Sequence, residues 1–300
     1  MISLEEIHII NNPNTDIDVC MELINNADYI DDYLFKLKER FKKINPKEYY
    51  LSYSGGKDSH FLYWFIKEYL QDTDIKIIGV NTYMEHHEIL KRINENCDVV
   101  LYPKLKPMEI KEKYGIPCFS KFQDEMIERY QKGSRTKNTL DAITGENRIT
   151  FKLNKKAREL TLNNELHKVS NKCCKVIKKD TLKEYQKTSN RKAILGVKGA
   201  ESKLRKAQYT NCFTKTGSFT PLWDLTNDIQ EEIIKRYKIE VPDVYKYIER
   251  TGCMGCPYGN RSGNTKKELG LLKENQKKFI SNYFKESYEV LGIDINEEYK

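Results

Sequence analysis

The sequence predicts an α/β fold with an open, mainly parallel, twisted sheet and helices on both faces. Residues 49–53 form an apolar, tyrosine-rich run typical of a buried strand, a glycine-rich turn follows, and residues 59–69 carry apolar side chains at helical spacing. Two further apolar runs, 75–80 and 99–101, flank a helical stretch at 85–93. This alternation of strands and helices is typical of a parallel sheet with right-handed crossovers.

Helical segments are expected on both sides of this core. Before Pro46, apolar residues recur at helical spacing and predict an amphipathic helix: Tyr33, Leu34, Leu37 and Phe41. A fourth strand is expected at 193–197 because its residues are small, branched and apolar. The C-terminal portion is expected to be helical, most clearly at 225–237 and 267–288.

The chain is expected to divide into three parts. These are an N-terminal helical segment, 1–45, a nucleotide-binding α/β domain, 46–260, and a C-terminal helical segment, 261–300. Within the α/β domain, residues at about 131–172 are polar and basic, contain several glycines and asparagines, and show no clear period. We therefore expect an insertion here that acts as a mobile segment or lid near the site.

Composition limits the classes of function. The chain has 300 residues and 39% hydrophobic content, which is enough to form a core. Its net charge of +8 favours anionic partners such as nucleotides or nucleic acid, with an ordinary Lys/Glu surface as the equal alternative. The sequence lacks an apolar run of about 18 residues and a signal pattern at Met1, so we expect a cytoplasmic protein with no membrane partner. A homodimer is one option for its assembly.

The turn after the first strand has the composition of a phosphate-binding loop, Ser54, Gly55, Gly56, Lys57, Asp58 and Ser59. Glycines allow consecutive backbone N–H groups to approach one anion. The start of the helix adds partial positive charge, and Lys57 adds a full charge. Ser54 and Ser59 can donate hydroxyl hydrogen bonds, and Asp58 can cap the helix or position Lys57. The spacing differs from the Gly-x4-Gly-Lys-Ser/Thr loop of the common NTPases, and the alternative is an ordinary glycine turn.

Four of the eight cysteines form two pairs that predict a metal centre, Cys173 with Cys174 and Cys253 with Cys256. Adjacent cysteines do not easily form a disulfide, because their Cα atoms lie about 3.8 Å apart and bridges need at least about 4.4 Å. Four thiolates suit an iron–sulfur cluster or tetrahedral zinc, and four unligated buried thiols are the third option. The other cysteines are assigned to packing: Cys20, Cys97, Cys118 and Cys212.

The loop, with its strand and helix, resembles the SGGKDS loop of the PP-loop ATP pyrophosphatases, which have an adenine nucleotide α-hydrolase-like fold. The resemblance implies that the loop binds ATP with Mg²⁺ and that Lys57 stabilises charge as an acceptor attacks the α-phosphate and pyrophosphate leaves. The four cysteines resemble the [4Fe–4S] ligand set of the assimilatory adenylyl-sulfate reductases, which belong to the same superfamily. Both motifs therefore point to one superfamily.

From about residue 49 to residue 259 the chain resembles the phosphoadenosine-phosphosulfate reductase family. Asn81 and Thr82 fall where that family contacts its nucleotide, and Lys178 completes a Cys-Cys-x-x-x-Lys segment. The resemblance implies that these residues bind the nucleotide, with Lys178 neutralising phosphate.

Residues 195–205 resemble the family signature Gly-x-Arg-x-x-Glu-Ser-x-x-Arg, with Lys198 in place of the first arginine. The resemblance implies that Lys198 and Arg205 neutralise phosphates and that Glu201 orients a phosphate or a ribose hydroxyl. A lysine binds an anion as a point charge and lacks the bidentate hydrogen bonding of arginine. The alternative for Lys198 and Arg205 is a solvated basic surface.

One feature of the sulfonucleotide reductases is missing. They carry a nucleophilic cysteine near the C-terminus in a Glu-Cys-Gly-Leu-His segment, and this sequence has no cysteine after Cys256. Our first hypothesis is therefore an ATP pyrophosphatase of sulfur-transfer type, similar to the tRNA thiolation and DNA phosphorothioation proteins, with a nucleic-acid acceptor and a sulfur donor. The second is a reductase of phosphoadenosine phosphosulfate or adenylyl sulfate, with a thioredoxin-like partner and the missing thiol supplied by that partner or by Cys212. The third is a non-catalytic nucleotide-binding redox sensor.

Overall fold

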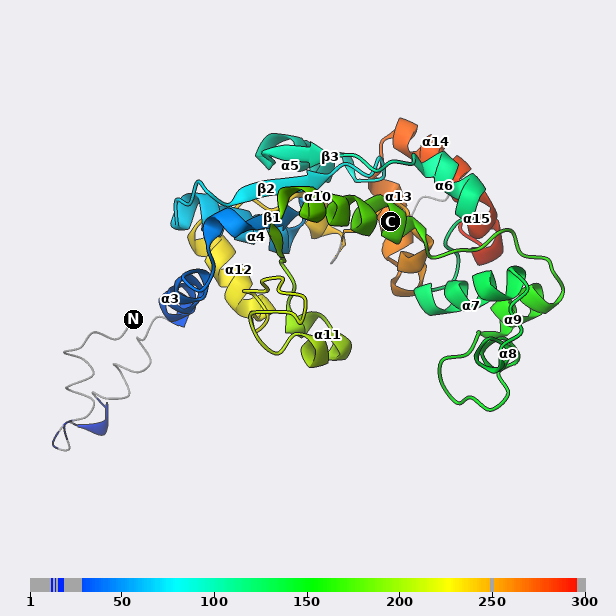
Figure 1. Ribbon diagram of the computed structural model, residues 1–300, viewed down its shortest axis with the longest axis horizontal. Coiled ribbons are helices and arrows are strands. Elements are labelled where there is room, and N and C mark those ends of the chain that lie inside the picture. The colour runs from blue at the N-terminus through cyan, green and yellow to red at the C-terminus, as the bar shows by residue number, and fades with distance from the viewer. Residues whose placement is uncertain (1–11, 13, 15, 19–28, 249–250, 296–300) are drawn as a thin grey trace. The chain divides into compact units, whose positions relative to one another are not determined.

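The computed structural model describes residues 12, 14, 16–18, 29–248 and 251–295. Its four strands are β1 (Tyr49–Tyr53), β2 (Lys76–Val80), β3 (Val99–Leu101) and β4 (Lys192–Ile194). They form one sheet in the order β3-β2-β1-β4, and both β1 with β4 and β2 with β3 pair in parallel (Figure 1). The predicted α/β class, with a mainly parallel sheet and helices on both faces, is confirmed.

The strand expected at 193–197 is shorter than predicted, because β4 ends at Ile194. The backbone N–H of Leu195 donates to the carbonyl of Phe219 instead of continuing the ladder with β1. Beyond it, Gly196 lies so close to the start of α4 (Lys57–Trp64) that an added Cβ would be 3.1 Å from the backbone of Asp58 and of Ser59. The end of this strand therefore packs against the loop region and leaves the sheet.

The chain divides into two compact units, and each is described here by itself. The first comprises Met1–Ser52, Asp58–Lys76 and Arg191–Glu240. The second comprises Tyr53–Lys57, Ile77–Asn190 and Val241–Lys300.

The first unit has an aromatic core. In α3 (Tyr29–Phe41) the buried side chains recur every three or four residues, which explains both the helix and the face that it buries. The ring of Phe41 lies 5.3 Å from Phe65, in the π-helical turn after α4, and 5.2 Å from Phe219. Arg40 of α3 holds Asp224 through two hydrogen bonds of 2.6 and 2.5 Å. The other helices among the described residues of this unit are α11 (Lys203–Gln208) and α12 (Asn227–Arg236).

The second unit is mainly helical (Figure 1). Its helices are α5 (His87–Asn96), α6 (Pro107–Tyr114), α7 (Lys121–Gln131), α8 (Lys137–Thr144), α9 (Lys155–Leu162), α10 (Thr181–Ser189), α13 (Asn264–Leu271), α14 (Glu274–Tyr283) and α15 (Lys285–Leu291). The predicted helical C-terminal portion is confirmed, but 267–288 contains breaks. Leu272 adopts an extended conformation after α13, and Lys273 begins the next helix with its backbone N–H bonded to Gln276.

Residues 131–172 contain two helices that the sequence did not reveal. Helices α8 and α9 lie here and, with α7, enclose a small apolar core: Cys118, Met126, Ile127, Ala142, Ile143, Leu153, Ala157 and Val169. The expected role of this segment as a mobile insertion or lid near the site stays a prediction. The helical period is hard to see because both helices have only eight residues and use small side chains such as Ala142 and Ala157 for packing.

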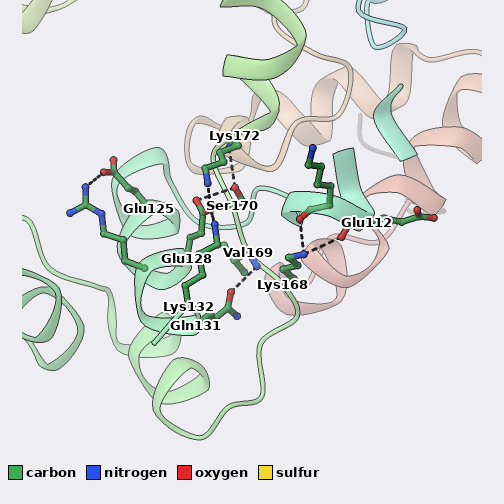
Figure 2. Close-up of polar contacts among 11 residues, drawn as sticks. Glu112, Glu125, Glu128, Gln131, Lys132, Lys168, Val169, Ser170 and Lys172 are labelled. Carbon is green, nitrogen blue, oxygen red and sulfur yellow. Dashed lines mark hydrogen bonds and ion pairs between the residues drawn. The ribbon is translucent and has the colours of Figure 1, made fainter. Parts of the chain in front are cut away.

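Ion pairs and hydrogen bonds fix the end of this segment, as Figure 2 shows. The buried carboxylate of Glu128 in α7 pairs with Lys132 and, at 2.6 Å, with Lys172. Ser170 donates a hydrogen bond to the same carboxylate. A cavity of about 300 Å³ lies beside them, lined by Tyr114, Glu128, Gln131, Lys132 and Lys168. Lys132 already binds the carboxylate of Glu128, and Lys168 already donates to two backbone carbonyls. We therefore assign the charged residues that line this cavity a structural role.

The buried carboxyl group of Asp124 should make the free energy of unfolding depend on pH. Its two carboxylate oxygens accept from the backbone N–H groups of Cys118 and Phe119, at 2.7 and 3.0 Å. Burial raises its pKa to about 6, against these hydrogen bonds, which lower it. The native state therefore holds the proton more tightly than the unfolded chain. The stability gained from this proton is present below pH 4 and is lost as the pH rises through 6.

We expect the free energy of unfolding of the wild type, relative to Asp124→Asn, to fall by about 1.4 kcal/mol between pH 5 and pH 8. Urea unfolding of both proteins at the two pH values measures this difference. Taking the difference between the two proteins removes the titration of all other groups. A constant difference would show that Asp124 keeps the same pKa in the folded and unfolded states.

Candidate functional site

The predicted phosphate-binding loop joins β1 to α4, and two glycines make its path possible. Gly55 has φ +72°, and an added Cβ would lie 2.9 Å from the carbonyl oxygen of Ile89. At Gly56 an added Cβ would lie 2.7 Å from the hydroxyl of Tyr245. A side chain at either position would push these neighbours away, so the close packing of the loop requires glycine.

The start of α4 already binds an oxygen atom. The backbone N–H of Lys57 donates to the Tyr245 hydroxyl at 3.0 Å, and that hydroxyl lies 2.9 Å from the hydroxyl of Thr251. A first-turn N–H has no partner within its own helix and therefore needs an external acceptor. A phosphate oxygen can accept a hydrogen bond from the same N–H group. The loop motif did not reveal the contact with Tyr245, because Tyr245 lies far away in the sequence.

In the first unit, Asp58 and Lys198 form a buried network. The Lys198 ammonium lies 3.0 Å from Asp58 Oδ1 and donates to Asn227 and Gln230 at 2.8 and 2.6 Å. Gln230 in turn donates to Asp58 Oδ1 at 2.9 Å. Lys198 is only 2% exposed, so the alternative of a solvated basic surface is wrong for this residue. In this structure its charge fixes the position of the Asp58 carboxylate.

Glu201 and Arg205, which belong with Lys198 to the family signature at 195–205, lie on two short elements. Gly199–Glu201 form a 3-10 turn, and Arg205 lies in α11, whose first turn is capped by the Ser202 hydroxyl at 3.2 Å from the Arg205 backbone N–H. The side chain of Glu201 lies outside what the structure describes, as does all of Cys20. The roles of Glu201 and Arg205 in nucleotide binding stay predictions.

In the second unit, Thr82 belongs to a buried hydrogen-bond network with Glu85. Its backbone N–H and its hydroxyl both donate to the Glu85 carboxylate, at 2.9 and 2.6 Å. Lys178 lies 3.5 Å from the same carboxylate, and the neighbouring Asn81 accepts from the backbone N–H of Tyr83 at 2.9 Å. The Thr-x-x-Glu spacing could have revealed Glu85 from the sequence, since it is the spacing of a capping box.

The four cysteines of the predicted metal centre interact electrostatically with one another. Cys173 is buried in an apolar core with Met254, against which Cys174 and Cys253 pack. All four are free thiols. Among the residues that the structure describes, no three cysteine sulfurs lie within 4.8 Å of one another.

The charges around these thiols favour thiolate at one position. A hydrogen bond from Cys173 lowers the pKa of Cys174 to about 6, and Lys121 and Lys178 add to this effect. Burial raises the pKa of Cys253 to about 11, against the attraction of Lys178. Burial lowers the pKa of Lys178, but the Cys253 thiol and Glu85 outweigh burial and raise it overall. Lys178 therefore lies between the Glu85 network and the cysteines as a fixed positive charge.

Comparison with known proteins gives only distant likenesses. No family model matches the sequence, and no curated protein matches it. Among solved structures, the chain is similar to an NH3-dependent NAD synthetase from Campylobacter jejuni, with 12% identity, a TM-score of 0.35, and coverage of 87% of this chain and 94% of that one. It is also similar to the NMN synthetase from Francisella tularensis, with 13% identity, a TM-score of 0.34, and coverage of 90% and 98%. None of the described helices is long and apolar enough to span a membrane.

Proposed function

We propose that this protein is a PP-loop ATP pyrophosphatase that binds ATP, or a related adenine nucleotide, at Ser54–Ser59. The observation that carries the proposal is the geometry of the loop. Gly55 and Gly56 bring the backbone into close packing, α4 begins at Lys57, and the N–H of Lys57 already binds an oxygen. A strand, a tight glycine turn and a helix start together make a site for phosphate.

The proposed reaction is adenylation of an acceptor. An acceptor oxygen attacks the α-phosphorus of ATP, a new phosphorus–oxygen bond forms, and the bond to the β-phosphate oxygen breaks to release pyrophosphate. Mg²⁺ accompanies the phosphates, and Lys57 and the N–H groups at the start of α4 stabilise the charge that builds up on them. Lys198 holds the Asp58 carboxylate in place at the first turn of the same helix.

Thr82, Asn81 and Lys178 are proposed as nucleotide-binding residues on the second unit. Thr82 is buried, and its network with Glu85 sets the path of the chain directly after β2. In open parallel sheets ligands bind beyond the carboxyl ends of the strands, and Asn81 directly follows β2. The positions therefore suit contact with a nucleotide, as the family resemblance implies.

The four cysteines are proposed to hold a [4Fe–4S] cluster. Tetrahedral zinc with bonds of about 2.3 Å would place its sulfurs about 3.8 Å apart. No three of these cysteine sulfurs lie within 4.8 Å of one another in the described part of the chain. A cluster holds its sulfurs farther apart, because irons and sulfides stand between them, so the lack of a closer group does not count against it. When bound, it would hold or deliver sulfur for transfer to the adenylated acceptor. Lys178 would help to keep its ligands deprotonated.

We expect Cys253→Ser to reduce the iron content of protein purified without oxygen by more than half, because a serine oxygen is a poor ligand for iron in a cluster. Cys97→Ser is the matched control, since Cys97 is also partly buried but packs against Gly79. Iron and sulfide analysis with the visible absorption spectrum measures the effect. Equal iron in the two variants, or zinc in place of iron, would contradict the cluster.

The partners in this proposal are a nucleic-acid acceptor and a sulfur-donor protein, in line with the net charge of +8. The test follows pyrophosphate release with ATP, Mg²⁺ and each candidate acceptor. We expect Lys57→Ala to reduce release at least 100-fold, whereas Lys47→Ala, an exposed lysine before β1, leaves it unchanged. Turnover only with a sulfonucleotide and thioredoxin would instead identify a phosphoadenosine-phosphosulfate reductase. Nucleotide binding without turnover would identify a non-catalytic sensor.

A further inference from the structure

Three consecutive side chains at the start of α5 have the arrangement of metal ligands. One nitrogen of His86, one nitrogen of His87 and a carboxylate oxygen of Glu88 all lie within 4.8 Å of one another. Among the residues that the structure describes, this is the only group of three or more histidine, cysteine or acidic ligand atoms that lie so close together. Its three residues belong neither to the four cysteines nor to the loop 54–59.

The histidines lack the partners that buried polar groups require. His86 is 2% exposed, and neither of its ring nitrogens has a hydrogen-bond partner. The Nδ1 atom of His87 has none either, and the two rings lie 4.2 Å apart. The backbone of Leu271 lies near the His86 ring, but no contact meets hydrogen-bond geometry. Leaving such nitrogens without partners in the interior costs stability, so their burial points to an absent ligand.

The carboxylate of Glu88 is held in place by a second contact. One of its oxygens accepts from the backbone N–H of Val244 at 3.1 Å. Such a contact is typical of a ligating carboxylate, because the outer hydrogen bond orients the oxygen that faces the ion. Glu88 supplies negative charge beside His86, while the nearby Lys273 opposes a cation.

We propose that His86, His87 and Glu88 bind a divalent transition-metal ion such as Zn²⁺. Two imidazole nitrogens and one carboxylate oxygen suit this class of ion, and water would complete a tetrahedral shell. The ion would influence the phosphate-binding loop indirectly. Glu88 accepts a hydrogen bond from the backbone of Val244, and the next residue, Tyr245, accepts one from the N–H of Lys57. The site would thus stabilise the Asp243–Lys246 turn that carries Tyr245.

The test uses the full chain, stripped with a chelator and titrated with Co²⁺ and Zn²⁺. Cobalt at this site should give the weak visible bands of a nitrogen and oxygen site, without the strong charge-transfer absorption of cobalt thiolates. We expect His87→Ala and Glu88→Gln each to weaken binding of this ion at least tenfold. His167→Ala is the matched control, because it removes a partly buried imidazole that hydrogen-bonds Ser287 elsewhere in the same unit.

A second readout excludes misfolding of the variants. Zn²⁺ should raise the melting temperature of the wild type and of His167→Ala, but not that of His87→Ala, because a ligand stabilises only the state that binds it. The proposal is overturned if all bound cobalt shows thiolate absorption. It is equally overturned if His87→Ala and Glu88→Gln bind the ion as tightly as the wild type. Neither result depends on the activity of the phosphate-binding loop.

Discussion

Replacing Gly55 with alanine is expected to weaken ATP binding at least 100-fold. The backbone of Gly55 has φ +72°, and an added Cβ would lie 2.9 Å from both Cγ2 and the carbonyl oxygen of Ile89. The carbonyl belongs to the first turns of α5 and cannot rotate away as a side chain can. The loop would therefore have to move, and the N–H groups that bind phosphate would no longer converge on one point.

Gly263→Ala separates this effect from the cost of a positive φ. Gly263 has φ +75°, and an added Cβ would meet nothing within 4 Å. Its loss of stability should be about 1 kcal/mol, the ordinary cost of alanine in this conformation, with ATP affinity unchanged. Calorimetric titration with ATP and Mg²⁺ measures both variants. If Gly55→Ala bound ATP as Gly263→Ala does, the loop would not be the nucleotide site.

Gly115→Ala is expected to cause the largest loss of stability, about 3 kcal/mol. Gly115 ends α6 with φ 89° and ψ −173°, a region that is essentially restricted to glycine. An added Cβ would lie 2.0 Å from the carbonyl oxygen of Lys168, which also accepts from the N–H of Ile116. The substitution would push apart the bridge between Ile116 and Val169, which anchors the end of the 131–172 segment.

The matched control is Gly133→Ala, at the other end of that segment. Gly133 also has a positive φ of +86°, but an added Cβ would meet nothing within 4 Å. We expect this variant to lose only about 1 kcal/mol. Urea unfolding followed by circular dichroism compares the two variants. Equal losses would mean that the close approach of Lys168 does not constrain the fold.

The sequence predicted the parts of the site that depend on local chemistry. The glycine turn after β1 is recognisable because glycine adopts the positive φ of Gly55 with little strain and allows the close approach at Gly56. The strands β1 to β3 are visible because each is a short apolar run of branched and aromatic residues. The metal centre expected from the two cysteine pairs stays a prediction.

Contacts between distant residues were not visible in the sequence. Nothing near Lys57 indicates that Tyr245 supplies an oxygen to its N–H, because 188 residues separate them. Lys198 resembled a phosphate ligand, but its burial against Asp58 depends on Asn227 and Gln230 of α12. Helices α8 and α9 were missed because each is short and packs through small residues, which weakens the periodic signal.

The products formed from ATP labelled in the α-phosphate show whether the protein releases pyrophosphate from ATP. We expect the label in AMP or in an adenylated acceptor, together with release of unlabelled pyrophosphate, and we expect both products to disappear in Lys57→Ala. Labelled ADP with inorganic phosphate would contradict this expectation, because the loop would then direct cleavage at the γ-phosphate.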